Sequence, residues 1–120
     1  MWHDDLVRRF ADACRRGDTE GLRAILDPDA AAVCDSGGTL PALGPIRGAD
    51  GVARLAIALL GERPGAELTA EAVNGRTGLA LRRTGRALAV AALDTTSAGI
   101  TAVLIVLNPA KLRAWHAAGG

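Results

Sequence analysis

The sequence predicts a single α+β domain in which helices cover one face of a curved antiparallel sheet. Three observations lead to this fold class. The stretch from Glu67 to Asn108 has the pattern of four consecutive strands, helical periodicity precedes it, and a short helical segment follows it. With 120 residues the chain is long enough for one core but not for two, so we expect one domain over residues 1–120.

Two helices and a strand are expected at the start of the chain. Apolar residues recur at helical spacing up to Gly17, which is placed to end the first helix. Asp18 or Thr19 can cap a second short helix, and Asp27-Pro28 is expected to stop it. The small apolar residues of Ala30–Asp35 then predict a strand.

An irregular segment and a third helix come next. Thr39–Ile46 contains two prolines and a glycine, which predicts an irregular edge segment. Gly48 opens a helix with Asp50 in its first turn, where a carboxylate interacts favourably with the helix dipole. This helix is apolar nearly all round, so we expect it to be buried between other elements.

The central stretch predicts an antiparallel meander. Asn74-Gly75 is a strong signal for a type I′ hairpin, because both central residues of that turn need positive φ. Thr84-Gly85 and Ser97-Ala98-Gly99 are the next two turns. The strands expected between the turns are Leu68–Val73, Gly78–Arg83, Ala87–Leu93 and Ile100–Leu107.

The last two predicted strands are apolar on both faces, unlike the first two, which alternate between apolar and polar residues. One face would be covered by the helices of this chain. The other face needs a different cover, so we expect a homodimer formed through the last strands.

Composition excludes several partner classes. The formal net charge is +1 and the basic residues form no cluster, so no nucleic-acid partner is expected. Two cysteines are too few for a disulfide framework, and no long apolar segment is present, so we expect a cytoplasmic protein without a membrane partner. His3 and His116 lie at opposite ends of the chain without neighbouring ligand residues, so neither a metal nor another cofactor is expected.

The order of elements resembles the nuclear-transport-factor-2-like (NTF2-like) superfamily in its SnoaL-like branch. The motifs that carry this resemblance are the Gly17-Asp18 break, the Asp27-Pro28-Asp29 stop and the Gly48 before the third helix. Further motifs resemble the SnoaL-like C-terminal domain of some bacterial extracytoplasmic-function sigma factors, most specifically Val106-Leu107-Asn108-Pro109 with Lys111-Leu112. The resemblance implies a cone-shaped fold: a bent antiparallel sheet with about three helices on its concave face and a short C-terminal helix.

The resemblance also implies positions for catalytic groups, and most of them are apolar here. Cyclases and epoxide hydrolases of this family carry a carboxylate in the closing strand, where this sequence has Ile105 beside Val103. Isomerase-like members carry a phenol on the first helix and an acid on a late strand, where this sequence has Phe10 and Val90. The isomerase general base on the first strand corresponds to Asp35.

Asp35 has two interpretations. At the mouth of an apolar cavity its pKa would be raised by desolvation, and it could remove a proton next to a carbonyl group. Alternatively, it accepts backbone hydrogen bonds at the Ser36-Gly37-Gly38 turn. Arg47 is placed to pair with Asp35 or with a ligand carboxylate, or to be solvated in its loop.

Asp94 and Trp115 are similarly ambiguous. Asp94 is either a second acid in the pocket or the cap of the turn at 95–99. Trp115, together with Trp2, either covers the open end of the cone or anchors a terminal segment.

Two classes of function follow, with a third as the simplest case. The first is a binding or regulatory module that holds a hydrophobic small molecule in an apolar pocket or docks a protein partner on its sheet. The second is an isomerase, cyclase or hydrolase that uses Asp35 as general base on an apolar carbonyl or epoxide, although no oxyanion stabiliser is identified. The third is a dimerisation unit whose cavity has collapsed.

Overall fold

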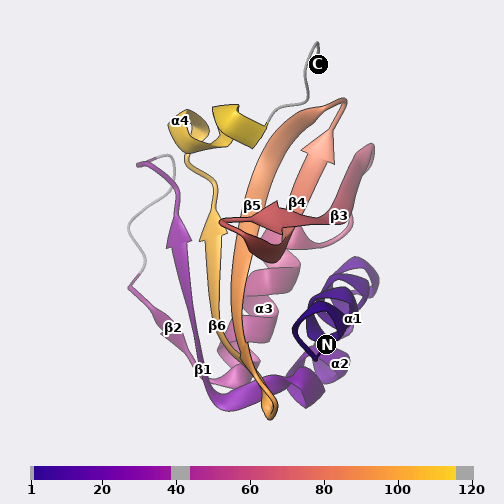
Figure 1. Cartoon of the computed structure of the whole chain (residues 1–120), viewed down its shortest axis with the longest axis vertical. Coiled ribbons are helices and arrows are strands. Elements are labelled where there is room, and N and C mark those ends of the chain that lie inside the picture. The colour runs from indigo at the N-terminus through magenta and orange to yellow at the C-terminus, as the bar shows by residue number, and fades with distance from the viewer. Residues whose placement is uncertain (1, 39–43, 116–120) are drawn as a thin grey trace.

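The computed structural model describes residues 2–38 and 44–115. Its elements form a mixed sheet of six strands with helices on both faces (Figure 1). In chain order they are α1 (Trp2–Arg16), α2 (Thr19–Ile25), β1 (Leu26–Asp35), β2 (Ile46–Arg47), α3 (Ala49–Leu60), β3 (Ala66–Val73), β4 (Arg76–Arg83), β5 (Arg86–Thr96), β6 (Gly99–Val106), α4 (Pro109–Leu112) and the 3-10 turn η1 (Arg113–Trp115).

The strand order is β2-β1-β6-β5-β4-β3, so the predicted four-strand meander is confirmed. One pair of neighbouring strands departs from the predicted antiparallel arrangement, because β1 runs parallel to β6. Parallel neighbours need a long crossover connection, and the chain between β1 and β6 provides it with α3 and the first three strands of the meander.

The hairpins have the predicted backbone geometry. Asn74 and Gly75 both have positive φ, of 52° and 82°. Thr84 and Gly85 repeat the pattern at the next hairpin, with φ of 48° and 79°, although a β-branched residue seldom adopts this conformation.

The first strand is longer than predicted. The second helix ends before Asp27-Pro28, as predicted, but β1 begins at once at Leu26 and includes both of these residues. The register to β6 is irregular between Leu26 and Ala31. Such an irregularity accommodates the proline, which cannot donate a hydrogen bond to a neighbouring strand. Most of the predicted edge segment at 39–46 lies outside the described residues, and its last residue, Ile46, starts β2.

Three helices pack on one face of the sheet. α1 lies against β3, β4 and β5, α3 lies against β1 and β2, and α2 contacts both helices. Together they bury the main core, whose largest fully buried side chains include Phe10, Leu22, Leu60, Leu79 and Ile105. α3 is less enclosed than predicted, because Arg54 and Ala58 are exposed on its outer side. No helix of the described residues is long and apolar enough to cross a membrane.

The opposite face of the sheet, here called the outer face, is only partly covered. α4 and η1 lie over β5, and Leu112 and Trp115 pack there with Val90 and Val106. Closer to β1 the outer face is open, as Leu104 of β6 is 39 % exposed. The predicted two-sided apolar character of the last strands is therefore confirmed, but the helices bury only one side completely.

Truncating side chains on the two faces of β6 should lower the free energy of unfolding by different amounts. Ile105→Ala removes a fully buried side chain and should lower the free energy of unfolding by about 2–5 kcal/mol. Leu104→Ala, on the neighbouring position of the same strand, should cost only about 1 kcal/mol because Leu104 is partly exposed. Urea denaturation followed by circular dichroism measures both. Equal losses would contradict the assignment of the two faces.

Candidate functional site

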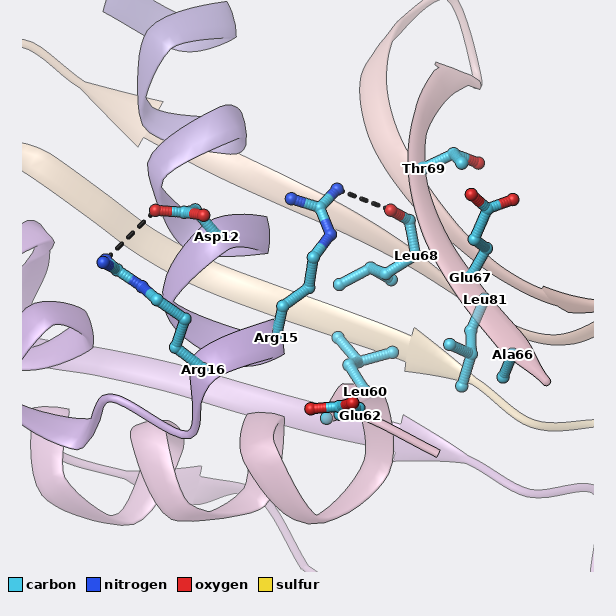
Figure 2. Close-up of a pocket in the computed structure, with 11 residues that line it drawn as sticks. Asp12, Arg15, Arg16, Leu60, Glu62, Ala66, Glu67, Leu68, Thr69 and Leu81 are labelled. Carbon is cyan, nitrogen blue, oxygen red and sulfur yellow. Dashed lines mark hydrogen bonds and ion pairs between the residues drawn. The ribbon is translucent and has the colours of Figure 1, made fainter. Parts of the chain in front are cut away.

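An open groove lies between the end of α1, the end of α3 and the first half of β3, with a volume of about 600 Å³. Figure 2 shows its lining side chains. Three leucines that are almost completely buried form the apolar part of the lining: Leu60 of α3, Leu68 of β3 and Leu81 of β4. The other lining residues are Asp12, Arg15, Arg16, Gly61, Glu62, Ala66, Glu67 and Thr69.

Arg15 connects the two sides of the groove. Its side chain leaves the last turn of α1, and its guanidinium donates a hydrogen bond of 2.5 Å to the backbone carbonyl of Leu68 (Figure 2). Leu68 belongs to β3, which is an edge strand of the sheet. This contact fixes the direction of the guanidinium and places its positive charge beside the leucines.

The other charged groups of the groove differ in their partners. Arg16 is neutralised by Asp12 at 3.0 Å and lies 3.8 Å from Asp18. Within residues 2–38 and 44–115, Arg15 has no carboxylate at ion-pair distance, and neither Glu62 nor Glu67 has a cation. Both glutamates are exposed. Among the described residues, the groove therefore combines an apolar lining with one guanidinium and two carboxylates that have no ion-pair partner.

Asp35 lies outside this groove, at the end of β1. Its carboxylate accepts hydrogen bonds from the Gly37 backbone amide at 3.1 Å and from the Asn108 side chain at 3.4 Å. It also forms an ion pair of 2.5 Å with the Lys111 ammonium. The hydrogen bond from Lys111, with smaller contributions from Gly37 and Asn108, lowers the pKa of Asp35. The expectation of a raised pKa in an apolar cavity was wrong, because these donors stabilise the charged form.

The other predicted pocket residues do not form one site. Phe10, Val103 and Ile105 are buried in the main core, where they pack instead of lining the open groove. The side chain of Val90 packs on the outer face, so it cannot share a pocket with Phe10. The inward position beside it belongs to Ala91, which pairs with Ile105. Neighbouring residues of a strand point to opposite faces of the sheet, so the position inferred on β5 lies away from Phe10.

The remaining candidates are also dispersed. Asp94 is 72 % exposed and pairs with Arg76 at 3.6 Å, so it is not an acid in a pocket. Arg47 is exposed on the edge strand β2, and the cation beside Asp35 is Lys111. Trp115 is a terminal anchor: its ring packs on the outer face and its backbone carbonyl accepts a hydrogen bond from Arg82.

His3 has partners that its terminal position did not suggest. Its Nε2 lies 2.8 Å from the Thr77 carbonyl, and its Nδ1 lies 2.7 Å from the Thr95 hydroxyl and 3.0 Å from the Arg76 guanidinium. A carbonyl only accepts and a guanidinium only donates, so this set fits the neutral ring with its proton on Nε2. His3 thereby ties the start of α1 to β4 and β5.

The sequence patterns did not identify the groove. Arg15 and Arg16 belong to the polar side of an amphipathic helix, which normally faces solvent. One sequence feature points towards the groove. Leu68 is an inward-facing apolar residue at the start of the meander, so another element must pack against it. Among the described residues, no group of three or more metal-ligating side chains occurs.

Comparison with known proteins adds structural relatives. No protein-family model and no curated protein matches the sequence. The extracytoplasmic-function sigma factor SigJ of Mycobacterium tuberculosis matches with a TM-score of 0.65 and 25 % identity, covering 91 % of this chain and 43 % of SigJ. The chain therefore spans less than half the length of SigJ.

Two further solved structures match over nearly their whole length. An NTF2-like protein of Burkholderia xenovorans has a TM-score of 0.58 and 19 % identity, covering 96 % of this chain and 95 % of its own. A candidate polyketide cyclase of Xanthomonas campestris has a TM-score of 0.60 and 18 % identity, with coverages of 94 % and 95 %. The chain therefore has the same fold as these NTF2-like proteins, as the resemblance in its sequence implied.

Proposed function

We propose that this chain is a small-molecule-binding regulatory domain and that its ligand occupies the groove between α1, α3 and β3. The observation that carries the proposal is the groove itself, whose 600 Å³ lie within the range of about 300–1,000 Å³ that is usual for ligand pockets. Its buried leucines offer an apolar surface, and Arg15 and the two glutamates offer polar anchors at its rim.

Binding fits the side chains better than catalysis does. Asp35, the acid of the enzymatic alternative, is not among the lining residues and is engaged by Lys111. The regulatory part of the proposal is supported by the similarity to SigJ, a sigma factor.

We also propose that the chain forms a homodimer through the open part of its outer face. Val33 and Leu104 are paired across β1 and β6 and are 46 % and 39 % exposed. The neighbouring outer positions, Ala92 and Val106, are apolar and only partly buried. A second copy of this face would remove the apolar patch from water.

Filling the groove should abolish ligand binding without unfolding the protein. Ala66→Phe places a ring in the groove, and a thermal-shift screen of apolar ketones, lactones, epoxides and carboxylic acids measures the effect. We expect compounds that stabilise the wild type to bind at least about tenfold more weakly to this variant, which corresponds to about 1.4 kcal/mol. Ala58→Phe, on the exposed side of α3, is the control. Equal binding by both variants would exclude the groove.

Asp35→Asn should affect stability and not chemistry. The pKa of Asp35 is lowered in the folded state, so its contribution is complete above the unfolded value of about 3.9 and is lost as the pH falls through the lower folded value. The free energy of unfolding of the variant should therefore be lower than that of the wild type at pH 7, and the difference should vanish in acid. Asp29→Asn, on the same strand, is the control. Turnover of a screened compound that disappears only in Asp35→Asn would instead support the enzymatic alternative.

Charges on the open outer face should prevent dimerisation. Val33→Glu would place two carboxylates at the centre of the symmetric interface, where they lose hydration and repel each other. We expect sedimentation velocity to show a dimer for the wild type and a monomer for this variant. Trp2→Gln, which changes an exposed apolar residue elsewhere, should leave the dimer intact. A wild type that is monomeric at all concentrations tested would refute the dimer.

A further inference from the structure

We propose that the groove selects apolar molecules that carry a single carboxylate, and that Arg15 anchors this carboxylate. The inference rests on the proposed binding function of the groove and names the chemical class of its ligand. It depends on the difference between two neighbouring arginines, on the apolar lining, and on the acidic residues at the rim.

Arg15 is the cation in the groove that lacks an anionic partner among the described residues. One of its terminal nitrogens donates to the Leu68 carbonyl at 2.5 Å, and this contact holds the guanidinium over the groove (Figure 2). A guanidinium has five N–H donors, so several remain for a ligand. Their planar arrangement matches the two oxygens of a carboxylate, which can accept two parallel hydrogen bonds.

Arg16, the next residue, provides an internal comparison. Its guanidinium lies 3.0 Å from Asp12 and 3.8 Å from Asp18, so its charge is already balanced within the protein. A carboxylate entering the groove would have to displace these partners to bind Arg16. The same ligand meets no competing carboxylate at Arg15.

The rest of the groove restricts the ligand further. Leu60, Leu68 and Leu81 provide an apolar lining, on which each additional buried methylene group should improve affinity about fourfold. Glu62 and Glu67 add two negative charges at the exposed rim. They repel every negative charge on a ligand, so molecules with several negative charges, such as phosphates or dicarboxylates, are disfavoured more strongly than a monocarboxylate. The combination favours a monocarboxylate with a hydrocarbon body.

Isothermal titration of the purified chain with octanoate, decanoate, octylamine and 1-octanol tests this selectivity. We expect octanoate to bind, decanoate to bind more tightly, and the amine and the alcohol to bind at least about tenfold more weakly than octanoate, as a charge-assisted hydrogen bond predicts. Added sodium chloride should weaken octanoate binding and leave alcohol binding unchanged.

Two arginine variants separate the anchor from general charge. Arg15→Gln should weaken octanoate binding at least about tenfold and leave 1-octanol binding unchanged. Arg9→Gln removes an exposed arginine of the same helix that pairs with Asp5 outside the groove, so it should alter octanoate affinity less than about twofold. Arg15→Lys keeps the charge but not the planar pair of donors, so it should give an intermediate affinity. Thermal denaturation of each variant shows whether it is folded. If Arg15→Gln does not fold, Arg15→Lys serves as the test of the anchor.

The outcomes distinguish this inference from the proposed function. If 1-octanol binds as tightly as octanoate and Ala66→Phe blocks both, the groove binds ligands but the assigned class is wrong. Equal octanoate affinity in Arg15→Gln and Arg9→Gln would overturn the anchor. If none of the four probes binds, while a compound from the wider screen is blocked by Ala66→Phe, the carboxylate class is overturned and the binding function stands.

Discussion

Close packing between the three helices and the concave face of the sheet is the constraint on which the rest of the structure depends. Phe10 from α1 and Ile105 from β6 are completely buried in this layer, together with small aliphatic side chains. Dense packing leaves little room for a ligand among these residues. The groove that we propose as the ligand site lies at the margin of this layer, where α1 and α3 both end beside the edge strand β3.

This position at the margin explains the chemistry of the groove. Residues at the end of a surface helix are commonly charged, so Arg15 and Arg16 reach the groove from α1 while leucines from the core form its apolar lining. The Leu68 carbonyl orients the guanidinium of Arg15. The guanidinium of Arg16 instead pairs with Asp12, which balances its charge. A charged anchor beside an apolar surface is an arrangement that recognises amphipathic ligands.

Contacts with β1 and β4 hold the C-terminal elements α4 and η1 on the outer side of the sheet. Asp35 at the end of β1 binds Lys111, and Arg82 of β4 pairs with Glu71 at 2.7 Å while donating to the Trp115 carbonyl. The pKa of Glu71 is lowered by its hydrogen bond from Arg82, with a smaller contribution from Thr69. These contacts hold α4 and η1 over β5. On the same side of the sheet, Val33 of β1 and Leu104 of β6 remain exposed.

The sequence by itself determined the features that depend on neighbouring residues. The hairpin at Asn74-Gly75, the end of α1 at Gly17 and the four-strand meander follow from local φ preferences and from short-range hydrophobic patterns. The motifs that resemble a known family added the fold class to these local features. Tertiary structure alone decided which face Val90 occupies, that Lys111 reaches Asp35, and that Arg15 meets Leu68. The last two contacts join residues 76 and 53 positions apart, and a single shift of register moves a side chain to the other face. Local propensity does not specify such contacts, because they depend on how the complete core packs.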